Sequence, residues 1–203
     1  FVFVKNTDKY RSKKELEEVK KINTHPLLKN ENYALSSEAR IYFYFAKIYC
    51  HYFMRDMEGS YFYAKKHVVF IESLLKKTPS TKLEKEYIAA VQNEVSFLVE
   101  LKRYEELIKT IKKLRSIPVQ ATDMKVRIFT SSYVNETNMY LSTGKFEKID
   151  FIIPAIENGL EELKGHINAE QERALYYNIA YIYFGAGNYT KSLEYLNKIL
   201  NNP

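Results

Sequence analysis

Four aromatic residues recur at nearly equal intervals along the 203-residue chain, and a short turn precedes each of them. They are Tyr61, Tyr104, Phe146 and Tyr189, which are separated by 43, 42 and 43 residues. The turns, with their aromatic residues, read RDMEGSY, ELKRY, STGKF and GAGNY. A fixed period of this size indicates a repeat protein, in which one structural unit is copied along the chain.

A helix is predicted on each side of every turn, because glycine and proline are scarce and apolar residues recur at spacings of three and four. The predicted first helices of the four pairs are 37–55, 81–102, 122–143 and 169–186. The second helices are 59–77, 104–116, 146–164 and 189–201, and a further helix is predicted at 9–23. Thr81-Lys-Leu-Glu84 and Asn168-Ala-Glu-Gln171 have the spacing of capping boxes. Pro154 falls inside a predicted helix, where we expect a kink.

These helices divide the chain into an N-terminal capping helix with its linker, over residues 1–36, and one array of four repeats. The repeats are predicted at 37–79, 80–119, 120–166 and 167–203. The chain begins Phe-Val-Phe-Val rather than with methionine, so we expect it to be a fragment of a longer protein.

Composition narrows the class of protein. The content of 46% hydrophobic and 28% charged residues is typical of a soluble globular or repeat protein. No apolar run approaches the about 20 residues of a transmembrane helix, so we expect no membrane partner and a cytoplasmic location. The net charge of +6 is a mild excess in which lysine alternates with glutamate, so nucleic acid is not an expected partner. A single cysteine, Cys50, excludes an internal disulfide framework.

Residues 173–203 resemble a tetratricopeptide repeat (TPR), and the resemblance extends more weakly back to residue 37. It rests on the large, small and aromatic positions Tyr176, Ile179, Ala180, Tyr183, Gly187, Tyr189, Ser192, Leu196, Ile199 and Pro203. The resemblance implies an all-α fold, a right-handed superhelical solenoid of antiparallel helix pairs with about nine helices. The period exceeds the usual ~34 residues, which longer helices such as those of bacterial TPR-like regulators would explain.

One asparagine recurs at the same register in three successive repeats. Asn93, Asn135 and Asn178 each lie 11 residues before the turn aromatic of their repeat. The TPR resemblance implies that first helices line a concave groove, where asparagines in some members bind a peptide backbone. A carboxamide suits that role because it is both a donor and an acceptor. In the alternative interpretation these asparagines only tie neighbouring helices together.

Further residues are predicted to share this groove because they lie near the asparagines or at matching places in the first repeat. They are Phe43, Lys47, Gln92, Asn138, Tyr177 and Tyr181. Glu94 and Glu136 each follow one of the asparagines, at a position that is apolar in the last repeat. We therefore expect both carboxylates to be at least partly buried and to have a polar partner.

The sequence favours a non-enzymatic scaffold that binds a protein segment or an extended peptide. The alternative is a structural or regulatory segment of a longer bacterial regulator, which packs on its own output domain or self-associates through an uncapped C-terminal end. No catalytic residue, cofactor or metal is predicted. STGKF lacks the first glycine of a phosphate loop, where Met139 stands, and Cys50-His51 has no partner at zinc spacing.

Overall fold

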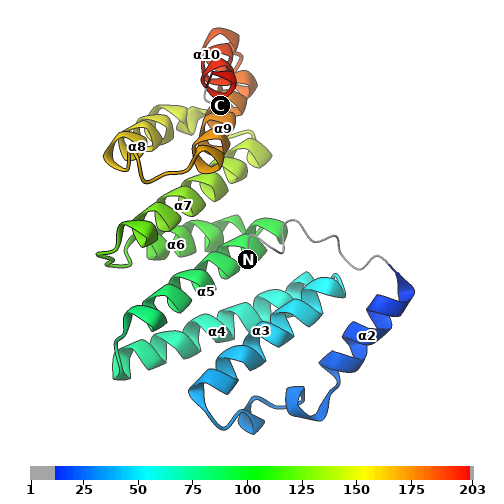
Figure 1. Cartoon of the computed structure of the whole chain (residues 1–203). Helices are drawn as coiled ribbons and strands as arrows, with labels where there is room; N and C mark the ends of the chain where they lie inside the picture. The colour runs from blue at the N-terminus through cyan, green and yellow to red at the C-terminus, as the bar shows by residue number, and fades with distance from the viewer. Residues whose placement is uncertain (1–11, 202–203) are drawn as a thin grey trace. The chain divides into compact units, whose positions relative to one another are not determined.

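The computed structural model describes residues 12–201, and over that range every regular element is helical (Figure 1). The α-helices are α2 (Lys13–Asn23), α3 (Ser37–Phe53), α4 (Met57–Lys77), α5 (Thr81–Glu100), α6 (Tyr104–Arg115), α7 (Thr122–Thr143), α8 (Ile149–Glu162), α9 (Ala169–Gly185) and α10 (Tyr189–Leu200). Three short 3-10 helices accompany them: η1 (Pro26–Leu28), η2 (Glu31–Tyr33) and η3 (Phe146–Lys148). The all-α prediction is confirmed.

The predicted helix pairs agree closely with these bounds, and the differences have local causes. Helix α4 begins at Met57, two residues before the predicted start, because Asp56 caps it by accepting from the Gly59 amide at 2.8 Å. Tyr61 consequently lies inside α4 rather than at its start. The helix predicted at 146–164 begins as η3, continues as α8 and ends at Glu162. Residues 9–11 of the predicted first helix lie outside the described residues.

Two compact units make up the chain, and the boundary between them falls inside α6. The first runs to Leu107, and in it α2 packs on α3, α3 on α4 and α4 on α5. The second begins at Ile108, and in it α7 packs on both α8 and α9, α8 packs on α9, and α9 packs on α10. Within each unit, helices that follow one another in sequence therefore pack together, as helix pairs do. The superhelix and its hand remain predictions.

Helices α9 and α10 approach closely because small residues lie between them. Ala180 and Ser192 are both buried, as predicted. Gly187 ends α9 with a φ of 78°, a left-handed conformation that glycine adopts at no steric cost. The core beneath consists of Ile152, Ile153, Ile156, Leu175, Ile179, Ala180, Ile182 and Tyr195.

One of the two predicted capping boxes is confirmed. In α9 the Asn168 side chain accepts from the Gln171 amide at 2.9 Å, and the Gln171 side chain accepts from the Asn168 amide at 3.1 Å. The box predicted at Thr81 is wrong, because Thr81 is already helical and Ser80 is the N-cap, accepting from the Leu83 amide. Pro154 lies inside α8, as predicted, and cannot donate a main-chain hydrogen bond there.

Candidate functional site

The three asparagines at the shared register are buried. Asn93, Asn135 and Asn178 expose 1%, 7% and 7% of their surface. The Asn178 amide nitrogen donates to Thr137 Oγ1 at 2.9 Å, a bond that joins α9 to α7. The Asn135 amide nitrogen donates to the Ser131 carbonyl at 2.7 Å, within α7. The expectation that these carboxamides face an open groove is therefore wrong, and Asn178 ties neighbouring helices together.

For Asn178 the reason is the helix that covers its side of α9. Helix α9 packs against α7, and Asn178 lies on the side of α9 that meets Thr137 of α7. Thr137 completes the arrangement, since its hydroxyl donates to the Tyr133 carbonyl at 2.8 Å and accepts from Asn178. The bond from Asn178 thus compensates the burial of two polar side chains.

Replacement of Asn178 by alanine is expected to lower the free energy of unfolding by about 1–3 kcal/mol, because it leaves a cavity and removes the donor to buried Thr137. Urea denaturation of the variant and the wild type measures this difference. Asn197→Ala, at an exposed position on α10, is the matched control and should stay within about 0.5 kcal/mol. Equal denaturation midpoints for Asn178→Ala and the control would show that the bond between α7 and α9 does not contribute to the free energy of unfolding.

Two predicted site residues of the first unit also make contacts inside the protein. Phe43 is buried in α3 and makes edge contacts with the Tyr44 and Tyr63 rings. Lys47 is buried as well, and its ammonium group donates to Asn23 Oδ1 at 2.6 Å, at the end of α2. Burial lowers the pKa of Lys47. Neither side chain lies on an open groove, contrary to the prediction.

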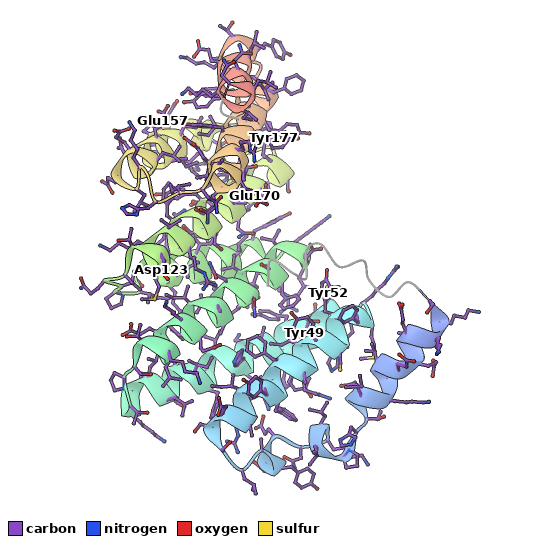
Figure 2. All side chains as sticks on the ribbon, in the orientation of Figure 1. Tyr49, Tyr52, Asp123, Glu157, Glu170 and Tyr177 are labelled. Carbon is purple, nitrogen blue, oxygen red and sulfur yellow. The ribbon has the colours of Figure 1, made fainter. Side chains whose placement is uncertain are left out.

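The remaining predicted site residues differ in exposure. Gln92 and Asn138 are half-buried, on α5 and α7. Tyr177 and Tyr181 are more than half exposed, and both lie on α9, where Figure 2 labels Tyr177. Of the predicted set, these two tyrosines are the ones that offer a broad surface to a ligand.

The two exposed tyrosines belong to a row of three stacked rings. The Tyr177 and Tyr181 ring centroids are 6.0 Å apart with planes 10° from parallel, and Tyr181 and Phe184 are 6.4 Å apart with planes 14° from parallel. Phe184 is also more than half exposed. We call Tyr177, Tyr181 and Phe184 the α9 aromatic stripe. Phe184 was not among the predicted site residues, although the spacing of four and three residues between the three rings places them on one helix face.

Other tyrosines of the chain are held differently, each donating its hydroxyl to a glutamate. The pairs are Tyr44–Glu31, Tyr61–Glu106, Tyr87–Glu72, Tyr140–Glu136, Tyr176–Glu172 and Tyr195–Glu157. Burial, together with the neighbouring carboxylate, raises the pKa of Tyr44, Tyr140 and Tyr176 to about 12. The Tyr140 and Tyr176 hydroxyls bond within their own helices and the other four bond to a different element, whereas the α9 aromatic stripe presents its rings to solvent.

The prediction that Glu94 and Glu136 are at least partly buried is confirmed. Glu136 is half-buried, accepts from the Tyr140 hydroxyl at 2.9 Å and forms an ion pair with Arg115 at 2.7 Å. Glu94 is buried. Burial and a hydrogen bond to Glu106 raise the pKa of Tyr61, and the nearby charge of Glu94 adds to that effect.

Residues 12–201 contain no group of three histidine, cysteine, aspartate or glutamate side chains arranged to hold a metal ion. Within the same residues, no helix has both the length and the apolar character needed to cross a membrane. Comparison with protein-family models, with curated protein sequences and with solved structures gave no match.

Proposed function

We propose that this chain is a non-enzymatic, TPR-like scaffold that binds an extended protein segment, and that the α9 aromatic stripe is its principal contact surface. The observation that carries the proposal is the row of three exposed, nearly parallel rings on one helix face. Exposed aromatic residues gathered in this way are typical of interaction sites. The succession of helix pairs and the repeat of 42–43 residues support the TPR-like part of the proposal.

The spacing of the rings suits an extended peptide. Side chains on one side of an extended chain recur every two residues, at about 6.4–6.8 Å, since each residue advances the chain by about 3.2–3.4 Å. The ring centroids are 6.0 and 6.4 Å apart. Successive same-side side chains of a peptide lying along α9 would therefore meet successive rings. The ring faces accept apolar and cationic groups, and the Tyr177 and Tyr181 hydroxyls can bond to the peptide backbone.

The helix beneath the stripe is rigidly held, which lowers the entropic cost of binding. Leu175, Ile179 and Ile182 of α9 are buried in the core of the second unit. Asn178, which directly follows Tyr177, is fixed by its bond to Thr137 of α7. In this proposal the buried asparagine supports binding indirectly, because it positions the helix that presents the rings.

Removal of two rings tests the proposal. The double variant Tyr177→Ala/Tyr181→Ala is expected to lose at least about tenfold in affinity for peptides captured by the wild type from an array of short synthetic peptides, since central aromatic contacts dominate interface energy. The melting temperature should stay close to that of the wild type because both side chains are exposed.

Tyr42→Ala, which removes an exposed tyrosine of the first unit, is the matched control and should retain wild-type affinity. Equal binding by the double variant and the wild type to every captured peptide would exclude the stripe as the contact surface.

A different surface, the exposed apolar residues of α10, favours the second candidate function, which is self-association of the chain.

A further inference from the structure

The exposed face of α9 carries a positive charge next to its three rings. Arg173 precedes Tyr177 by four residues, and Tyr181 and Phe184 follow Tyr177 by four and seven. Residues at these spacings lie on one face of a helix. Arg173 is exposed, so the face that presents the α9 aromatic stripe to solvent also carries this arginine.

Arg173 differs from the other arginines of residues 12–201. Within that range its guanidinium group has no ion pair, hydrogen bond or ring contact. The remaining arginines of the range, each of which interacts with another group, are Arg40, Arg55, Arg103, Arg115 and Arg127. An exposed cation without a partner in the fold is available to pair with an anionic group of a ligand.

The position of Arg173 continues the spacing of the rings. Four residues of an α-helix advance about 6 Å along its axis, since each residue rises by about 1.5 Å. Side chains on one side of an extended peptide recur at about 6.4–6.8 Å. When one of these side chains lies on the Tyr177 ring, the next one toward the start of α9 therefore reaches Arg173.

We propose that the peptides bound by the α9 aromatic stripe carry an acidic residue two positions from an apolar one, and that Arg173 binds the acidic carboxylate. The inference rests on the proposed function, because it requires an extended peptide to lie along the stripe. A guanidinium group pairs with a carboxylate through two parallel N–H donors. The contact therefore also fixes which end of the apolar run lies at the start of α9.

Glu170 is the opposing charge on the same face. It is exposed and has no partner in the described part of the chain, and Figure 2 labels it near the start of α9, before Tyr177. It precedes Tyr177 by seven residues, about 10 Å along the axis, so it is farther from the rings than Arg173. As an acidic residue of the first turn, it also interacts favourably with the helix N-terminus. The charge beside the rings is therefore positive.

Four synthetic peptides test the inference by fluorescence anisotropy at low salt, each with the same uncharged fluorophore and with both ends blocked. The first is Asp-Ser-Leu-Ser-Leu-Ser-Leu and the second is the same sequence reversed. The other two carry asparagine in place of aspartate. At least one aspartate peptide is expected to bind the wild type about threefold or more tightly than its asparagine counterpart, because the pair with Arg173 is charge-assisted.

Two neutral substitutions one turn apart separate the charges. Arg173→Gln should remove the preference for aspartate, whereas Glu170→Gln, the matched control, should keep it. Arg173→Glu should instead favour peptides with lysine at the aspartate position. Thermal melts of all three variants should stay close to that of the wild type, since both positions are exposed.

Equal binding of each aspartate peptide and its asparagine counterpart to the wild type would overturn the inference, as would a failure of all four peptides to bind. Loss of the preference in Glu170→Gln but not in Arg173→Gln would also overturn it. The stripe itself is tested separately, because Tyr177→Ala/Tyr181→Ala should weaken binding of the asparagine peptides as well. That weakening without any preference for aspartate would refute the role of Arg173 and leave the proposed function standing.

Discussion

The free energy of unfolding is expected to fall by about 3 kcal/mol through His67 alone as the pH drops from 6.5 to 4, and His67→Leu is expected to remove that part of the fall. His67 lies on α4 and is fully buried. It packs against the Tyr44 and Phe45 rings, at centroid distances of 5.8 and 4.8 Å. Neither of its ring nitrogens has a hydrogen-bond partner among the described residues.

The direction of the effect follows from the burial of this imidazole. Burial lowers the pKa of His67 from 6.5 to about 4. Between these values the unfolded chain binds a proton that the folded chain does not, so stability is lost as the pH falls. Leucine at this position is apolar and of similar size, so the variant should be at least as stable as the wild type at neutral pH.

Urea denaturation of the wild type and the variant at a series of pH values measures the difference between their acid dependences. Carboxylates with a lowered pKa, such as Asp56 and Glu31, also lose stabilisation in acid but are common to both proteins. His166→Leu, at an exposed position, is the control and should keep the wild-type fall. Parallel curves for the wild type and His67→Leu would contradict the assignment.

Arg115→Met is expected to lower the free energy of unfolding by about 2–3 kcal/mol. The Arg115 guanidinium group pairs with Glu136 at 2.7 Å, donates from Nε to Ser132 at 2.9 Å, and lies 3.8 Å from the centre of the Tyr133 ring. Its loss leaves the half-buried Glu136 carboxylate without its cation. The cost is below the ~3–5 kcal/mol of a fully buried pair, because the Arg115 side chain is 30% exposed.

A double-mutant cycle separates the ion pair from the packing of Arg115. Glu136→Gln keeps an acceptor for the Tyr140 hydroxyl while it removes the charge. The double variant Arg115→Met/Glu136→Gln should be more stable than the sum of the single changes predicts, with a positive coupling of about 1 kcal/mol or more. Strict additivity in urea denaturation would show that the pair contributes nothing.

The helices could be predicted from sequence because their signals are local. Turn glycines, capping residues and apolar spacing all act within a few residues, so α7 has the predicted bounds and α9 differs from them by one residue. The error at Thr81 arose because Ser80 and Thr81 could each cap the helix, and the start of α4 was misplaced because the Asp56 cap was not recognised. The partial burial of Glu136 was also predictable, because it replaces an apolar residue at a core register.

The environment of the asparagines was harder to predict, because it depends on residues distant in sequence. The register of Asn178 fixes the face it occupies but not what covers that face, and its partner Thr137 lies 41 residues away. The exposure of aromatic residues is similarly nonlocal. Tyr176 and Tyr177 are adjacent, yet the first donates to Glu172 and the second is exposed, a difference that the packing of α9 decides.

Nuclear magnetic resonance of the chain with isotope-labelled tyrosine rings tests the central claim most directly, namely that the α9 aromatic stripe binds an extended peptide. Titration with a peptide captured on the array should shift the ring signals of Tyr177 and Tyr181 first and most strongly. Tyr195, which is buried and donates to Glu157, should shift little. Binding that leaves the Tyr177 and Tyr181 signals in place while other tyrosines shift would contradict the account.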